Sequence, residues 1–129
     1  MTRRILLVED NPANQLLASA VLERDGFEVV VAESAHDAER EITRHKPDLI
    51  LMDIQLPEMD GLAFTRQLKA DPMTASIAVV AMTAHAMVGD EADALAAGCA
   101  GYIAKPIDTR TLGEQVRSFL QAEKAEAGA

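Results

Sequence analysis

Residues 49–53, Leu-Ile-Leu-Met-Asp, form an apolar run that ends in an acid. Three other short apolar runs end in polar residues in the same way: residues 5–8 lead into Glu9 and Asp10, 77–82 into Thr83, and 102–104 into Lys105. An almost wholly apolar run is typical of a central parallel strand that is covered on both faces. If the four runs are parallel strands of one sheet, their ends share the edge where open α/β sheets bind ligands.

Strand-like and helix-like segments alternate five times along the chain. The expected strands cover about residues 4–8, 29–31, 48–52, 77–82 and 100–104. Apolar residues at helical spacing predict helices at about 13–25, after Ser34 as far as Pro47, from 62 to about 71, at 87–97 and at 108–120. Five such units predict an α/β fold, a doubly wound parallel sheet of five strands with helices on both faces.

Several residues support the helix assignments. The first helix carries a repeat of Ala13, Leu16, Leu17, Ala20 and Val21, and Gly26 is placed to end it. Ser34 and Asp108 are the expected caps of the second and last helices. Their apolar faces are expected at Ala35, Ala38 and Ile42, and at Leu112, Val116, Phe119 and Leu120. We assign residues 1–121 to one domain and residues 122–129 to a flexible C-terminal tail.

Composition narrows the function. The chain of 129 residues is 49% hydrophobic, which suits one domain with an aliphatic core. Its net charge of −9 argues against direct binding to nucleic acid, because phosphate backbones require a positive surface. Cys99 is the only cysteine and is expected to be buried. No apolar run approaches a membrane span and no signal peptide is recognisable, so we expect a cytoplasmic protein.

The acids at the strand ends predict a metal site. Glu9, Asp10 and Asp53 would lie together, and like charges ~4 Å apart repel by about 4 kcal/mol at a surface-like dielectric. A bound cation relieves this repulsion, and oxygen ligands suit Mg²⁺. With Lys105 and Thr83 alongside, the edge has the groups needed to hold a divalent cation and a phosphoryl group.

The motifs at these strand ends resemble one family. They are Glu9-Asp10-Asn11, Asp53 followed by the loop 56–61 (Leu-Pro-Glu-Met-Asp-Gly), Met82-Thr83-Ala84, and Lys105-Pro106 with Tyr102 shortly before. Over about residues 3–120 the chain resembles a receiver domain of bacterial two-component response regulators, a flavodoxin-like module. It is similar to stand-alone receivers, including single-domain cell-cycle regulators. The resemblance implies a phosphorylation-activated signalling switch.

The resemblance also implies roles for individual residues. Asp53 would accept the phosphoryl group, and Lys105 and Thr83 would contact it. Mg²⁺, or Mn²⁺ in its place, would be held by Asp10, Asp53 and the backbone carbonyl of Gln55, with Glu9 acting through water. Thr83 and Tyr102 would form the switch, and the Lys105-Pro106 bond would be a cis peptide. No other cofactor is expected.

The implied partners are proteins. A histidine kinase or a histidine phosphotransfer protein would donate the phosphoryl group. The face formed by the helix at 87–97, the strand at 100–104 and the helix at 108–120 would bind a downstream target or a second receiver. The chain would not be an enzyme beyond catalysing its own phosphotransfer and slow autodephosphorylation.

Three alternatives compete with this interpretation. A flavodoxin needs a Ser/Thr/Gly-rich phosphate loop where this chain has Glu9-Asp10-Asn11-Pro12. An aspartate-nucleophile phosphatase needs a second acid at the position of Gln55. A constitutive binding adaptor has no need of the full set of acids, threonine and lysine. Of the histidines, His36 and His45 are expected on the exposed face of the second helix, and His85 follows Thr83 closely.

Overall fold

The computed structural model describes residues 2–56, 59–83, 90–105 and 107–128, without the side chains of residue 90 and of residues 122–128. The strands are β1 (Arg4–Val8), β2 (Glu28–Ala32), β3 (Leu49–Asp53), β4 (Ala78–Thr83) and β5 (Gly101–Ala104). The helices are α1 (Pro12–Arg24), α2 (Ala35–Arg44), α3 (Gly61–Ala70), α4 (Asp90–Ala97) and α5 (Leu112–Gly128).

The strands form one parallel sheet in the order β2-β1-β3-β4-β5. The chain leaves β1 toward β2 on one side and then returns to place β3 on the other. The carboxyl ends of β1 and β3 therefore flank the point where the winding reverses, which is the usual ligand-binding crevice of such sheets. The predicted flavodoxin-like α/β fold is confirmed.

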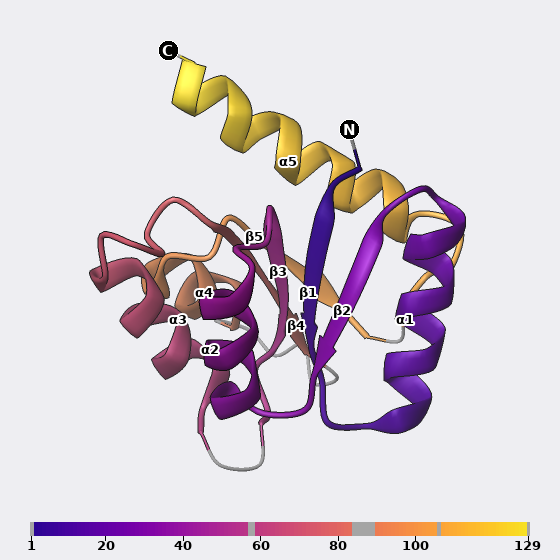
Figure 1. The fold of residues 1–129 in the computed structure, drawn as a ribbon, viewed down its shortest axis with the longest axis horizontal. Helices are drawn as coiled ribbons and strands as arrows, with labels where there is room; N and C mark the ends of the chain where they lie inside the picture. Colours follow the sequence, from indigo (N-terminus) through magenta and orange to yellow (C-terminus); the bar gives the residue numbers. More distant parts are fainter. Residues whose placement is uncertain (1, 57–58, 84–89, 106, 129) are drawn as a thin grey trace.

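Helices cover both faces of the sheet (Figure 1). On one face, α1 and α5 pack through Ala18, Leu22, Leu112 and Val116. On the other face, α2, α3 and α4 contribute a second core layer that includes Ala38, Ile42, Phe64, Leu68 and Ala94. The three central strands are buried along their whole length apart from the half-buried Arg4, as their continuous apolar runs predict.

Short polar side chains start the helices that follow the sheet edge. Asn11 Oδ1 accepts hydrogen bonds from the backbone N–H groups of Ala13 and Asn14 at 2.9 and 3.2 Å, and Ser34 Oγ accepts one from Asp37 at 3.1 Å. These caps satisfy backbone donors that have no partner within the helix. Gly26, with φ of +94°, closes α1 as predicted.

The buried face of α1 differs from the face that the repeat suggests. Its buried residues are Ala18, Val21 and Leu22, whereas Leu16 and Leu17 are 74% and 41% exposed. The repeat is helical in spacing, but most of it lies on the solvent side, and Val21 alone of the repeat is buried. Sequence spacing identifies a helix more securely than it identifies which apolar stripe packs against the sheet.

The last helix also differs from its predicted bounds. Asp108 starts a turn rather than the helix: its carboxylate accepts from the Arg110 backbone N–H at 2.9 Å, and α5 begins at Leu112. The backbone then stays helical to Gly128, where we expected a tail from residue 122. Alanine, glutamate and lysine, which dominate this segment, are strong helix formers. The expected inward-facing residues of α5 are buried, apart from the half-buried Phe119.

Other expectations can be placed on the structure. His36 and His45 are exposed, as predicted, and His85 lies outside the described residues. Cys99 is buried, and burial raises the pKa of its thiol. Within the described part of the chain, no helix has the length and apolar character that crossing a membrane requires.

Candidate phosphoacceptor site

The polar residues that end four separate strands come together at the carboxyl edge of the sheet. Val8 and Met52 are register partners, so Glu9 follows β1 directly beside Asp53 at the end of β3. Thr83 ends β4 opposite Ala104 of β5, and the Lys105 backbone N–H donates to the Thr83 carbonyl at 2.7 Å. The parallel topology thus places these side chains at one edge, as the sequence predicts.

Three carboxylates form a compact cluster at this edge. One oxygen each from Glu9, Asp10 and Asp53 can be chosen so that all lie within 4.8 Å of one another. Glu9 is 1% exposed and Asp53 is 5% exposed, whereas Asp10 faces solvent. Glu9 Oε2 is buried and has no hydrogen-bond partner among the described residues. A cluster of oxygen donors with one such atom fits a hydrated divalent cation.

Lys105 supplies positive charge to the same cluster. Its Nζ donates to Glu9 Oε1 at 2.5 Å and to Asp53 Oδ2 at 3.2 Å, and its side chain is 11% exposed. Burial opposes the charged ammonium, but the hydrogen bond that Lys105 donates to Glu9 and the charges of Asp53 and Glu9 outweigh this effect and raise the pKa of Lys105. Lys105 therefore remains a cation held between two carboxylates.

Glu9 is the acid of the cluster whose negative charge is least favoured by its surroundings. Burial raises the pKa of its carboxyl, and the neighbouring Asp53 raises it further, against the lowering influence of Lys105. A single ammonium thus compensates only part of the negative charge of three acids. Negative charge at the site therefore exceeds the positive charge that Lys105 provides, and a divalent cation would compensate the remainder.

The loop after β3 orients Asp53. The Gln55 backbone N–H donates to Asp53 Oδ1 at 2.9 Å, and an isolated antiparallel bridge joins Gln55 to Asp60. Asp60 Oδ1 in turn caps α3 by accepting from the Leu62 backbone N–H at 3.0 Å. The carbonyl of Gln55, which the resemblance assigns to the metal, therefore belongs to a segment hydrogen-bonded to Asp53, the expected phosphoacceptor.

The remaining predicted residues lie as follows. Thr83 is 1% exposed at the end of β4, and Tyr102 is half-buried in β5. Pro106 lies outside the described residues, and with it the predicted cis peptide. Two contacts were not anticipated: the Gln15 side-chain amide donates to the Glu9 carbonyl at 2.6 Å, and Lys105 reaches Glu9. The sequence places Lys105 near the acids, but neither specific contact is signalled by it, because both depend on side-chain placement across separate elements.

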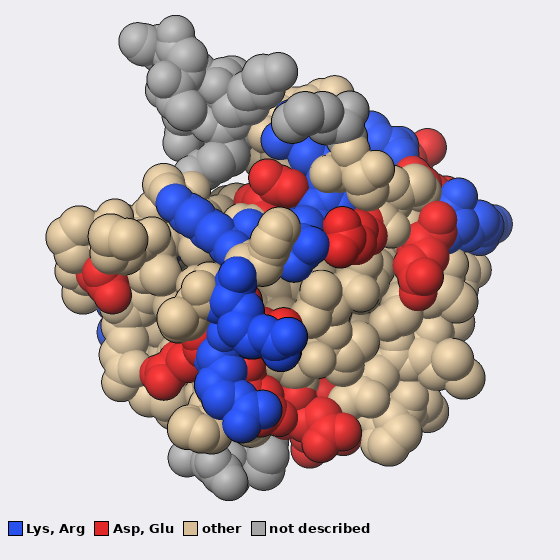
Figure 2. Space-filling view, in the orientation of Figure 1, with Lys and Arg blue, Asp and Glu red and all other residues tan. Residues whose placement is uncertain are grey.

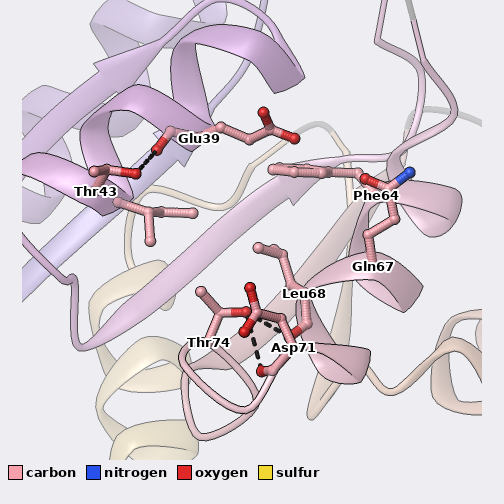
Figure 3. Close-up of a pocket in the computed structure, with 8 residues that line it drawn as sticks. Glu39, Thr43, Phe64, Gln67, Leu68, Asp71 and Thr74 are labelled. Atoms are coloured by element: carbon pink, nitrogen blue, oxygen red, sulfur yellow. Dashed lines mark hydrogen bonds between the residues drawn. The ribbon is translucent and has the colours of Figure 1, made fainter.

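A surface pocket lies elsewhere, between α2 and α3 (Figure 3). Its volume is about 270 Å³, and Phe64 and Leu68 line it together with Glu39 and Asp71. The residues that line it come from α2, from α3 and from the segment after α3, and they include none of the strand-end residues described above. The acid cluster is therefore the stronger candidate for the chain's chemistry.

The surface seen in Figure 2 carries mixed charge, with Lys and Arg side chains beside acidic ones. On α2, Arg40 and Arg44 form ion pairs with Asp37 and Glu41 at 3.7 and 3.3 Å. Such a mixed surface is unlike the continuous positive face that nucleic-acid backbones require.

Comparison with known proteins places the chain in a family. The model of the response regulator receiver domain matches residues 5–117. The polar-differentiation response regulator DivK of Brucella ovis is 43% identical over 120 residues, which cover 93% of this chain and 98% of the relative. DivK of Brucella anthropi is 42% identical over the same length.

Solved structures agree with this assignment. A CheY-like receiver domain protein from Methanospirillum hungatei has a TM-score of 0.88 at 28% identity, covering 98% of this chain and 99% of its own. The receiver domain of a sensor histidine kinase from Pseudomonas aeruginosa, solved with a magnesium ion coordinated in its active-site cleft, has a TM-score of 0.84 at 36% identity, covering 94% and 99%.

The chain belongs to the response regulator receiver domain family. Receiver domains of two-component systems take phosphoryl groups from histidine kinases, bind Mg²⁺ at an acidic site and act as phosphorylation-activated switches. The chain is thus a DivK-like signalling protein.

Proposed function

We propose that Asp53 of this chain accepts a phosphoryl group from a phosphohistidine protein in a Mg²⁺-dependent reaction. The observation that carries the proposal is the cluster of Glu9, Asp10 and Asp53, whose oxygens lie within 4.8 Å of one another beside Lys105. A carboxylate oxygen of Asp53 attacks phosphorus, the bond from phosphorus to the imidazole nitrogen breaks, and the imidazole leaves to take up a proton. Slow hydrolysis of the acyl phosphate returns the chain to its starting state.

The cation site uses residues already in place. Asp10, Asp53 and the Gln55 carbonyl would hold Mg²⁺ directly, and Glu9 would act through water. Mg²⁺, when bound, neutralises the charges of the carboxylate and the phosphoryl group. Lys105 then exchanges its carboxylate partners for a phosphoryl oxygen, as a point charge can. The Thr83 hydroxyl donates to another phosphoryl oxygen.

The exposed apolar face of α1 is the surface on which we place the phosphodonor. Leu16 and Leu17 are 74% and 41% exposed on a helix that begins right after Asp10 and whose Gln15 contacts the Glu9 carbonyl. A protein that brings a phosphohistidine to Asp53 meets this helix first. The donor is a histidine kinase or a histidine phosphotransfer protein that presents an apolar helix face.

The output surface is the face formed by α4, β5 and α5. Among the described side chains of α4 only Ala94 and Ala97 are buried, and Leu95 is 50% exposed. Alanines bury little area, so a small free-energy bias can move this helix. Tyr102 in the neighbouring strand lies on the route from Thr83 to this surface. A downstream protein or a second receiver binds here.

Labelling with acetyl phosphate tests the proposal. The wild-type chain should acquire acid-labile phosphate in Mg²⁺ or Mn²⁺ and none in excess EDTA. Asp53→Asn should abolish labelling, whereas Asp48→Asn, which changes an exposed acid just before the same strand, should leave it intact. Equal labelling of Asp53→Asn and wild type would overturn the proposal, and failure of the wild type to label at all would favour a constitutive adaptor.

A further inference from the structure

Gly61 begins α3 directly against the backbone that carries Asp53. A Cβ atom at this position would lie 2.5 Å from the Asp53 carbonyl oxygen and 2.7 Å from Ile54 Cα. Real Cβ contacts are essentially never shorter than 3.0 Å. The opposing atoms belong to the backbone at the end of a buried strand, so they cannot rotate away as a side chain can. The contact exists only because residue 61 has no side chain.

The close approach lies where the two ends of the loop after β3 meet, with residues 54–55 beside residues 60–61. We call this place the loop neck. The Gly61 backbone N–H donates to the Ile54 carbonyl at 3.0 Å, and the Gln55–Asp60 bridge joins the same two segments. Ile54 is tied on its other side to Met82 of β4 by a hydrogen bond of 3.1 Å. The backbone of residues 53–55 is therefore held between β4 and the start of α3.

The backbone of residues 53–55 determines where two groups of the site point. It carries the Asp53 carboxylate, and it carries Gln55, whose N–H donates to Asp53 Oδ1 at 2.9 Å. A displacement of this backbone by a few tenths of an ångström moves both the carboxylate and the Gln55 carbonyl. Mg²⁺ demands near-ideal octahedral geometry, so its affinity responds to displacements of this size.

Gly101 and Gly113 make close approaches of a different kind. A Cβ at Gly101 would meet the Phe119 ring, and a Cβ at Gly113 would meet the Asp25 carboxylate. Both opposing groups are ends of side chains, which can adopt other rotamers. Of these three glycines, Gly61 is the one whose neighbour is the backbone of the site itself.

We infer that Gly61 is a positioning residue for phosphotransfer: its missing side chain lets the loop neck close on the 53–55 backbone and aim the Asp53 carboxylate and the Gln55 carbonyl at one cation. This inference rests on the proposed function, since it assigns Gly61 to the same site. Alanine favours helices over glycine by about 1 kcal/mol. If the close contact were unimportant, Gly61→Ala would be neutral or stabilising.

Mg²⁺ titrations of the metal-free wild type, Gly61→Ala and Gly113→Ala, followed by ¹H–¹⁵N NMR, test the inference, with urea unfolding of each. Gly61→Ala should weaken Mg²⁺ binding at least tenfold and shift the Gln55 amide resonance before any metal is added. The added methyl group of Gly113→Ala faces the Asp25 side chain, and neither residue belongs to the site. This variant should therefore bind Mg²⁺ within twofold of wild type. Gly61→Ala that binds Mg²⁺ within twofold of wild type would overturn the inference.

Two further arms complete the test. A wild-type chain that binds no Mg²⁺ would contradict the proposed function, whereas normal binding by both wild type and Gly61→Ala would contradict the role of Gly61 alone. If Gly61→Ala does not fold, even with trimethylamine N-oxide as a stabiliser, Asp60→Ala replaces it, because it removes the Asp60 Oδ1 cap that holds the start of α3, where Gly61 lies, without adding an atom. Weakened Mg²⁺ binding by Asp60→Ala supports the inference, and binding within twofold of wild type overturns it.

Discussion

Lys105 Nζ lies 2.5 Å from Glu9 Oε1, so the lysine that is expected to meet the phosphoryl group is paired with one of the acids expected at the cation site. It also contacts Asp53 Oδ2 at 3.2 Å. Lys105 thus acts as a tethered counter-ion for the cluster. A divalent cation that enters the site competes with this ammonium for the same carboxylates.

Replacement of Lys105 by methionine, which keeps an unbranched side chain but removes the ammonium and its charge, should therefore strengthen Mg²⁺ binding. We expect a gain of about 1 kcal/mol, or roughly fivefold in affinity, in line with modest net values for partly solvated ion pairs. The phosphorylated variant should nevertheless fail to switch, because the phosphoryl oxygen lacks its cationic partner. Titration calorimetry measures the first effect, with the exposed Lys46→Met as control, and Mg²⁺ affinity below that of wild type would contradict it.

Glu9→Gln should stabilise the metal-free protein at neutral pH. The raised pKa of Glu9 shows that its buried charge is unfavourable in the absence of metal, and glutamine mimics the neutral acid. We expect a gain of about 0.5–2 kcal/mol in the free energy of unfolding, the usual size of a single stabilising substitution. Urea unfolding in EDTA measures it, with Glu28→Gln at an exposed position as control.

The pH dependence of this gain follows from linkage. A carboxyl whose pKa is raised in the folded state contributes stability below its usual pKa of 4.5, and that contribution is lost as the pH rises through the folded pKa. The advantage of Glu9→Gln should therefore be absent below pH 4.5 and grow as the pH increases. An advantage that shrinks with rising pH would refute the assignment of Glu9 as the acid whose negative charge is least favoured by its surroundings.

Leu16→Ala should separate donor docking from folding and chemistry. The side chain is 74% exposed, so its loss should change the free energy of unfolding by less than about 0.5 kcal/mol. Labelling by acetyl phosphate should be unchanged, whereas phosphotransfer from a phosphohistidine protein should slow several-fold. The matched control is Leu112→Ala: this residue is fully buried, and its truncation should cost about 2–5 kcal/mol of stability. Unchanged transfer to Leu16→Ala would place the donor elsewhere.

Amide exchange should locate the output surface. Beryllofluoride with Mg²⁺, which mimics the phosphoryl group, should change exchange most in α4 and β5, from Asp90 to Ala104. The reason is that a helix anchored mainly through Ala94 and Ala97 has a low cost of local opening. Changes confined to α1, with α4 and β5 unaffected, would move the output surface away from α4, β5 and α5.

Much of this architecture is predictable from sequence because each apolar strand is followed directly by the polar residues of the candidate site. Apolar runs ending in Asp53 and Thr83 define central parallel strands, and parallel topology brings their ends to one edge without knowledge of any side-chain contact. The start of α2 after Ser34 follows from local hydrogen bonding. These features depend on neighbours in the chain.

The rest depends on tertiary packing. The repeat on α1 does not reveal that Leu16 faces solvent, since several apolar stripes were compatible with its spacing. The pairing of Lys105 with Glu9 joins residues far apart in sequence. The contact of Gly61 with the Asp53 backbone depends on how closely the start of α3 approaches the end of β3, which the sequence does not specify. The helix α5 extends to Gly128 because the residues after 121 have high helix propensity, although the apolar periodicity has ended there. The domain boundary at residue 121 stays a prediction.

The central claim, that Asp53 is the phosphoacceptor, can be read out at residue level by borohydride trapping. Borohydride reduces an acyl phosphate to the alcohol, so a phosphorylated aspartate becomes homoserine. After treatment with acetyl phosphate and Mg²⁺, peptide mass spectrometry should find homoserine at residue 53 and aspartate at residues 10, 48 and 60. Homoserine at another position, with residue 53 unmodified, would contradict the account.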